Sequence, residues 1–163
     1  MGWLDRFPGR KRADDPQALA RVTPGDSVEA GGETWNVTAV LFYHDAGSEW
    51  PVVKIERGGD TAWIALEDGK IVRYDHLDLP VGPDGRTSWN GRLYAREEMG
   101  NATVSRVAGT VDVTVGDTLS YQVLRSDVDA RGWLSVEAWP SGFVDVSAGR
   151  FWPVDRIVSG KET

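Results

Sequence analysis

Residues 49–69, EWPVVKIERGGDTAWIALEDG, decide the fold of this chain, because residues 132–149, GWLSVEAWPSGFVDVSAG, repeat their pattern. Each stretch is an apolar run led by tryptophan, a glycine break, a second apolar run and a glycine turn. That order predicts a β-hairpin followed by another turn. Its recurrence indicates two related β-units that complete one another.

Further short strands are predicted on both sides of the two hairpins. Residues 34–42 alternate between apolar and polar side chains, and so do residues 111–115, which is the period of a half-buried strand. We expect strands near 49–56, 61–66 and 70–75 in the first half, and near 92–97, 102–107, 110–115, 118–125, 132–139, 143–147 and 150–154 in the second. The expected core residues are Trp35, Val37, Ile55, Trp63, Val111, Val136 and Val144.

Beyond residue 20 the sequence contains no convincing amphipathic helix, so the predicted fold class is all-β and antiparallel. We expect two pseudo-repeated bent sheets or half-barrels packed together across a Trp-rich interface, with a single long sandwich as the alternative. Residues 1–20 are expected to form a short helical or disordered segment with a basic tether, residues 21–158 the all-β domain, and residues 159–163 a disordered tail. The two pseudo-repeats cover about 21–77 and 91–158, on either side of the loop-like residues 78–90.

Charge is distributed unevenly along the chain. The whole chain carries −7, but the first twelve residues hold four basic side chains against one aspartate, so the remainder carries −10. An acidic body repels a phosphate backbone, and we therefore expect no nucleic-acid partner. The sequence has no cysteine, no apolar run long enough to span a bilayer and no apolar signal core, which favours a cytoplasmic location.

The N-terminal segment combines apolar and basic side chains. Its apolar residues have helical spacing, and its basic run follows a stop at Pro8-Gly9. The membrane-anchor candidates are Trp3, Leu4, Phe7, Arg10, Lys11 and Arg12. One interpretation is a frayed terminus. The other is a peripheral contact, through residues 1–12, with a partner or with the inner face of the membrane.

Six motifs follow one another along the chain: MGWLDRF at 1–7, PGDSV at 24–28, GETWNV at 32–37, SEW at 48–50, AWIALE at 62–67 and WLSVEAW at 133–139. In these motifs and their order, the chain resembles the bacterial family called domain of unknown function 4178 over nearly its whole length. The resemblance implies an association with membrane-stress or membrane-remodelling proteins of the phage-shock type, or with aminopropyltransferase-like proteins. It implies no catalytic residue.

Residues 132–139 present two different faces. The apolar side chains alternate onto one face, and the partner-binding candidates Trp133, Glu137 and Trp139 lie on the other. Two indoles flanking a carboxylate could hold a cation or an amine, or could face a protein partner. The alternative is that both faces are buried, because tryptophan is a common core anchor in small β-domains.

The chain has two histidines, and each lies next to an aspartate at a predicted strand end. The metal-ligand candidates are His44, Asp45, Asp75 and His76, since imidazole and carboxylate suit a divalent ion. Neither pair has a recognised ligand spacing, and no Gly-x-Ser-x-Gly elbow is present. The sequence therefore favours a non-catalytic binding or adaptor domain with a protein partner and no cofactor. The alternative is a small metal-dependent or hydrolytic enzyme that uses His44 and His76.

Overall fold

The structure is a computed structural model that describes residues 15–128 and 132–160. Its described part begins with a short 3-10 helix, η2 (Pro16–Arg21), and Asp15 caps this helix by accepting a hydrogen bond from the Gln17 N–H at 3.0 Å. Within the described ranges, no helix has the length and apolar character needed to cross a membrane. The predicted anchor at residues 1–12 lies outside the described residues.

Strands make up most of the rest of the described chain. They are β1 (Ser27–Ala30), β2 (Glu33–Asp45), β3 (Ser48–Arg57), β4 (Asp60–Glu67), β5 (Lys70–Leu77), β6 (Arg86–Trp89), β7 (Arg92–Gly109), β8 (Thr118–Ser126), β9 (Gly132–Ala138), β10 (Val144–Phe151) and β11 (Arg156–Val158). All their pairings are antiparallel. The predicted all-β antiparallel class is confirmed.

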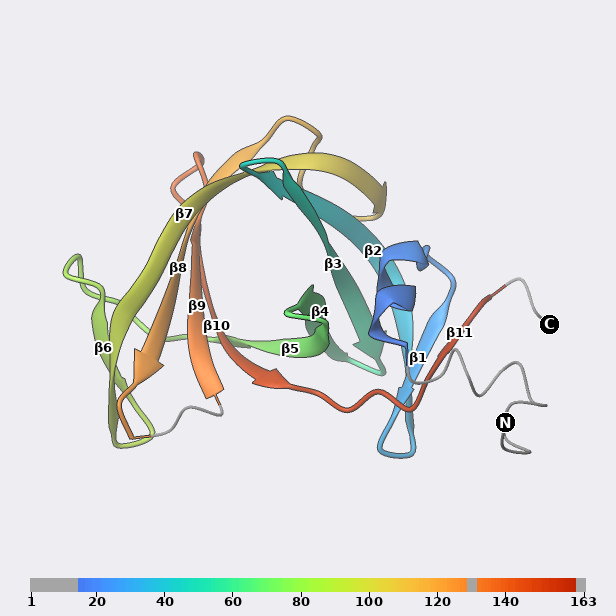
Figure 1. The fold of residues 1–163 in the computed structure, drawn as a ribbon, viewed down its shortest axis with the longest axis horizontal. Coiled ribbons are helices and arrows are strands. Elements are labelled where there is room, and N and C mark those ends of the chain that lie inside the picture. The colour runs from blue at the N-terminus through green and yellow to red at the C-terminus, as the bar shows by residue number, and fades with distance from the viewer. Residues whose placement is uncertain (1–14, 129–131, 161–163) are drawn as a thin grey trace.

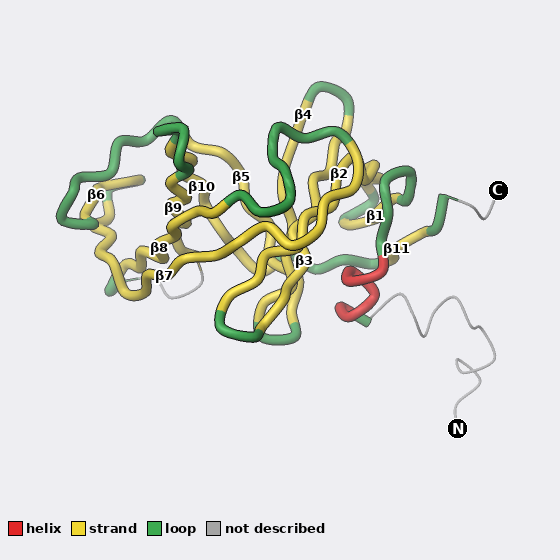
Figure 2. Tube along the Cα trace, turned by 90° about the horizontal axis from the view of Figure 1, so that it is seen from above, coloured by secondary structure: helices red, strands yellow, loops and turns green. Residues whose placement is uncertain are grey.

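Eight of the strands close into a ring. Their order is β2-β3-β4-β5-β10-β9-β8-β7, and a further ladder between β7 and β2 completes the circle (Figure 1). The ring consists of two four-stranded meanders, β2 to β5 and β7 to β10, which join edge to edge through the β5–β10 and β2–β7 ladders. Seen from above, the strands β6 to β10 form one group, and the strands β1 to β4 form a second group beside it (Figure 2).

Strands β1 and β6 lie outside the ring and pair with the parts of β2 and β7 that the β2–β7 ladder leaves free. Strand β2 pairs with β1 through residues 33–36 and with β7 through residues 39–44. Strand β7 likewise pairs with β6 through residues 92–95 before it meets β2 through residues 103–109. Register shifts between Val37 and Ala39, and between Phe42 and Tyr43, fall where β2 changes partners or bends, as β-bulges commonly do.

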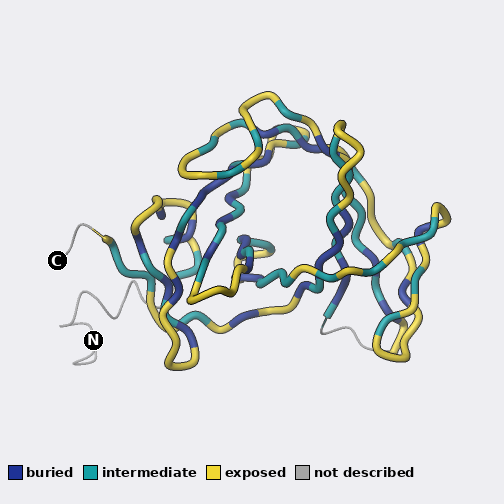
Figure 3. Tube along the Cα trace, turned by 180° about the vertical axis from the view of Figure 1, so that it is seen from behind, coloured by how far each residue is buried: buried dark blue, intermediate teal, exposed yellow. Residues whose placement is uncertain are grey.

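Buried side chains form three cores, and exposed residues gather at the turns (Figure 3). The first core lies under η2 and β1 and includes Leu19, Val28, Trp35, Val53, Ile55 and Ile64. The third core belongs to the meander β7 to β10. It includes Tyr94, Leu124, Leu134, Val136 and Val146, and Trp89 packs against it. The second includes Leu41, Tyr43, Val104, Leu119 and the partly buried Trp50, Trp63 and Trp139. Because these side chains come from strands on different sides of the ring, the second core fills its interior.

Several detailed sequence predictions differ from the structure. Residues 110–115 are not a strand, because β7 runs unbroken to Gly109 and a turn follows; Val111 still packs partly against the second core. Residues 143–147 and 150–154 are not two strands, because β10 is continuous from Val144 to Phe151. Val144, predicted to be core, is 51% exposed at the start of β10, whereas Val146, on the same face two residues later, is buried in the third core. Trp63 is only partly buried, within the ring interior.

Two of the predicted domain boundaries can be compared with the structure. The loop-like residues 78–90 contain the strand β6, and of the predicted tail only Ser159 and Gly160 are described; the Gly160 N–H donates to Asp26 Oδ1 at 2.9 Å. The repeated stretches fall on β3–β4 and on β9–β10, which are the second and third strands of one meander and the third and fourth of the other. The pseudo-repeats at about 21–77 and 91–158 stay a prediction.

Candidate functional site

Strand β9 carries polar side chains into the ring. Leu134 and Val136 face the third core, so the alternation of the strand turns Trp133, Ser135 and Glu137 to the interior. Glu137 meets Tyr43 there: the Tyr43 hydroxyl donates to Glu137 Oε1 at 3.4 Å. Tyr43 belongs to β2, and two further strands of the ring separate β2 from β9. The hydrogen bond therefore crosses the interior of the ring.

Glu137 holds its proton unusually tightly. Burial, followed by the negative charge of its cross-strand neighbour Asp145, raises its pKa to about 7, and the hydrogen bond from Tyr43 acts in the opposite direction. A donor–acceptor distance of 3.4 Å makes that hydrogen bond a long one. Within residues 15–128 and 132–160, Glu137 has no basic side chain as an ion-pair partner. Its charge is therefore poorly compensated by the protein.

Two indole rings contact Tyr43, the hydrogen-bond partner of this carboxylate. The Tyr43 ring contacts the Trp50 ring edge to face at 6.0 Å and the Trp139 ring at 6.4 Å. Trp50, Glu137 and Trp139 are each only partly buried. A carboxylate beside indole and phenol faces is a combination that suits an organic cation, because the acid supplies charge and the rings supply cation–π attraction.

A histidine lies next to this group, on the neighbouring carboxylate. His76 Nδ1 is 2.8 Å from Asp145 Oδ1, and His76 Nε2 is 3.1 Å from Asp78 Oδ1. The hydrogen bond to Asp145, followed by the one to Asp78, raises the pKa of His76 above its usual value. When it is protonated, His76 pairs with Asp145 and Asp78 and not with Glu137.

A second glutamate in the same interior is bonded differently. The Tyr74 hydroxyl donates a short hydrogen bond to Glu67 Oε2, and Trp133 Nε1 donates to the Tyr74 hydroxyl at 3.2 Å. Burial raises the pKa of Glu67, and the Tyr74 hydrogen bond opposes that rise. Gly149 makes room for this group, because a Cβ there would lie 2.7 Å from both Trp133 Nε1 and Tyr74 Cε1. Every member has a partner, so we assign this group to the structure of the ring.

The three partner-binding candidates have different surroundings. Trp133 is 5% exposed and packs against Tyr74 and Phe151, so it supports the interior and has no free face for a partner. Glu137 and Trp139 both contact Tyr43. Sequence reasoning missed Tyr43 because it comes from a strand far away in the chain, and no local pattern links it to β9.

The four metal-ligand candidates are not brought together. Asp75 and His76 are neighbours on β5, so their side chains point to opposite faces: Asp75 pairs with Arg73 at 3.0 Å, whereas His76 binds Asp145. Asp45 accepts a hydrogen bond from the Tyr121 hydroxyl at 3.2 Å, and His44 lies on β2. No cluster of three or more potential ligands occurs in the part of the chain that the structure describes. The grouping of His44 with His76 at a metal stays a prediction.

Residues 23–153 match the family model described as Domain of unknown function (DUF4178). The chain belongs to the DUF4178 family. The match spans β1 to β10, and so the complete ring with Glu137, Tyr43 and Trp139. A relative of this DUF4178 chain is an uncharacterized protein of Aquifex aeolicus (strain VF5). The two are 38% identical over an alignment of 163 residues, and the alignment covers 85% of this chain and 91% of that protein. No solved structure matches the chain.

Proposed function

We propose that this DUF4178 chain is a non-catalytic binding domain that accepts a cationic side chain of a protein partner, a lysine ammonium or an arginine guanidinium, at Glu137. One observation carries the proposal: a carboxylate with a pKa of about 7 is bonded to Tyr43, whose ring contacts Trp50 and Trp139, and no described basic residue pairs with it. An ionised carboxylate held away from water is costly unless a cation pairs with it. A ligand cation would supply that partner.

The geometry favours binding over hydrolysis. A hydrolytic site needs a nucleophile within reach of a free base. Both ring nitrogens of His76 lie on carboxylates, and Ser147, its cross-strand neighbour on β10, is buried. His76 therefore serves Asp145 and Asp78 rather than a serine hydroxyl.

The proposed partner is a protein of the membrane-stress or membrane-remodelling group, met in the cytoplasm or at the inner face of the membrane. The support for this part is the family resemblance together with the apolar and basic residues 1–12. A basic surface on that partner would also be attracted to the −10 charge of the body and would associate faster with it than a neutral surface.

The test uses defined cations rather than an unknown partner. The carboxyl carbon of Glu137 is followed by NMR while pH is varied, with Nα-acetyl-lysine amide present or absent. Pairing with the ammonium should lower the pKa of Glu137 from about 7, and the Nε-acetylated compound, which lacks the charge, should leave it unchanged. Affinity should fall about tenfold between pH 8 and pH 6, because the acid that pairs with the cation becomes protonated.

Two variants complete the test. Glu137→Gln removes the charge and should abolish binding of the lysine compound. Glu33→Gln is the control, because Glu33 is an exposed acid on β2 that pairs with Arg57 at 3.0 Å, and it should bind like the parent protein. Equal binding by the Glu137→Gln variant would overturn the proposal.

A further inference from the structure

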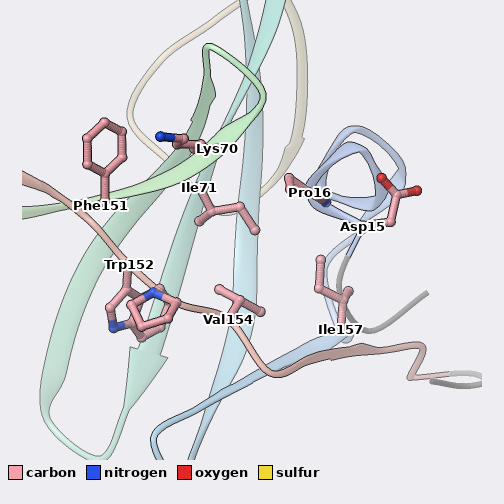
Figure 4. A pocket seen from close by; sticks show the side chains of 9 residues that line it. Asp15, Pro16, Lys70, Ile71, Phe151, Trp152, Val154 and Ile157 are labelled. Carbon is pink, nitrogen blue, oxygen red and sulfur yellow. The ribbon is translucent and has the colours of Figure 1, made fainter. Parts of the chain in front are cut away.

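An apolar groove opens beside the first core, which contains its lining residues Ile71 and Trp152. It has a volume of about 300 Å³, and its lining residues are Asp15, Pro16, Lys70, Ile71, Phe151, Trp152, Pro153, Val154 and Ile157 (Figure 4). Phe151 is 48% exposed at one end of it. An apolar depression of this kind on an otherwise charged protein usually marks an interaction site.

The described chain begins at the rim of this groove. Asp15 and Pro16, which connect η2 to the preceding residues, line one side, and the segment after β10 lines the other (Figure 4). Residues 1–14 therefore start beside the apolar wall. Phe7 is eight chain steps from Asp15, and an extended chain covers roughly 26 Å in eight steps. The N-terminal apolar residues are thus within reach of the groove.

The composition of the N-terminal segment complements the groove. Trp3, Leu4 and Phe7 are apolar, and Pro8-Gly9 allows the chain to reverse direction before the basic run. In the sequence, residues 10–12 are within five positions of Asp15, the acidic residue of the groove lining. Lys70, whose Nζ lies 4.8 Å above the Phe151 ring, is at the other end of the groove from Asp15 (Figure 4). The basic run therefore does not have to approach this positive charge.

We propose that this groove is the docking site of residues 3–7 of the same chain. The apolar side chains would bury against Ile71, Phe151 and Val154, and the basic run would remain near Asp15. The same three apolar residues are the membrane-anchor candidates, so they cannot occupy the groove and a lipid surface at the same time. Docking would therefore hide the anchor, and an anionic membrane would compete for it.

The chain has no cysteine, which permits a direct test. Gly2→Cys in the full-length protein is labelled with a nitroxide, and methyl signals are compared before and after the label is reduced. The methyl groups of Ile71, Val154 and Ile157 should lose most of their intensity while the nitroxide is active. Those of Leu134, Val136 and Val146 in the third core should keep theirs. Equal intensities at the groove with active and reduced label would overturn the proposal.

Variants within the segment leave the described fold untouched. Trp3→Ser, Leu4→Ser and Phe7→Ser together should restore the groove signals, whereas the polar control Asp5→Asn with Arg6→Gln should not. Loss of signal that persists in the triple serine variant would contradict docking through the apolar residues. A mixture of nitroxide-labelled chain with separate isotope-labelled chain checks for a second copy as the occupant. Groove broadening in that mixture, at the level seen within one chain, would overturn same-chain docking.

Vesicles test the competition. Anionic phosphatidylglycerol vesicles should restore the groove signals and bind the protein, and neutral phosphatidylcholine vesicles should do neither. Groove signals that stay broadened while the protein is bound to anionic vesicles would overturn the claim that docking and membrane binding exclude each other.

Discussion

Two glutamate–tyrosine pairs lie in the same ring interior, and their hydrogen bonding differs. Glu67 receives a short hydrogen bond from Tyr74, which in turn accepts one from Trp133. Glu137 receives a 3.4 Å hydrogen bond from Tyr43 and faces the like charge of Asp145. The comparison separates an acid in a chain of hydrogen bonds from an acid that faces a like charge and has one long hydrogen bond. It is the second acid that we propose as the binding site.

The largest expected difference between the two pairs is in packing. Trp133→Ala removes a buried indole that donates to Tyr74 and should lower the free energy of unfolding by about 3–5 kcal/mol. Trp139→Ala, at the partly buried end of β9, should cost less than half as much. Urea unfolding followed by circular dichroism measures both. Equal losses would show that the Glu137 side is as much a part of the core as the Glu67 side.

The next effect depends on pH. The pKa of Glu137 is raised in the folded protein from 4.5 to about 7, so the folded state binds this proton more tightly than the unfolded chain does. Stability should therefore fall as pH rises from 4.5 to 7 and level off above that. Glu137→Gln removes the loss and should stabilise the protein by up to about 3 kcal/mol at pH 8 and by almost nothing at pH 4. Thermal unfolding of both proteins across that pH range is the measurement, and a destabilised variant at pH 8 would contradict it.

Removing the two hydroxyl groups sharpens the contrast. Tyr74→Phe leaves Glu67 and Trp133 without their shared partner and should cost about 1–3 kcal/mol of unfolding free energy. Tyr43→Phe loses one long hydrogen bond and should cost less than about 1 kcal/mol, while raising the pKa of Glu137 further because the opposing hydrogen bond is gone. Denaturant unfolding gives the first quantity and carboxyl NMR the second. A larger loss for Tyr43→Phe would reverse the two roles.

The smallest effect concerns His76. Its pKa is raised by Asp145 and Asp78, so it contributes stability below the unfolded-state pKa near 6.5, and that contribution is lost as pH rises through the folded pKa. Its side chain is 57% exposed, and solvent screening should hold the contribution below about 1 kcal/mol. His76→Gln should therefore lower stability slightly at pH 5.5 and leave it unchanged at pH 9. A loss that is the same at both pH values would show a packing role instead.

The sequence predicted the features of the fold that depend on local patterns. Alternation within residues 34–42 and 132–139 is local, and it identified β2, β9 and the face of β9 that carries Glu137. Alternation failed at residues 110–115, because Val111 and Val113 pack partly on the second core from a loop. A loop that packs on a core with one side alternates between apolar and polar side chains as a half-buried strand does, although it forms no ladder with another strand.

Ring closure could not be predicted from local patterns. It depends on the β5–β10 and β2–β7 ladders, which pair Tyr74 with Gly149 and Leu41 with Val107. Nothing near Leu41 in the chain specifies a partner more than sixty residues away. The same distance in sequence concealed Tyr43 as the neighbour of Glu137, although the strand of each was found.

Ring closure also has a consequence for solubility during the life of the protein. A strand at the edge of a sheet exposes unpaired backbone groups that can recruit another chain, and long edges promote aggregation. Here eight strands pair on both sides around a circle, and the two strands at the ends of the described sheet, β11 and β6, contain three and four residues. Edges this short give an incoming strand little to pair with, so the fold resists the templated stacking to which open β-sheets of similar size are prone.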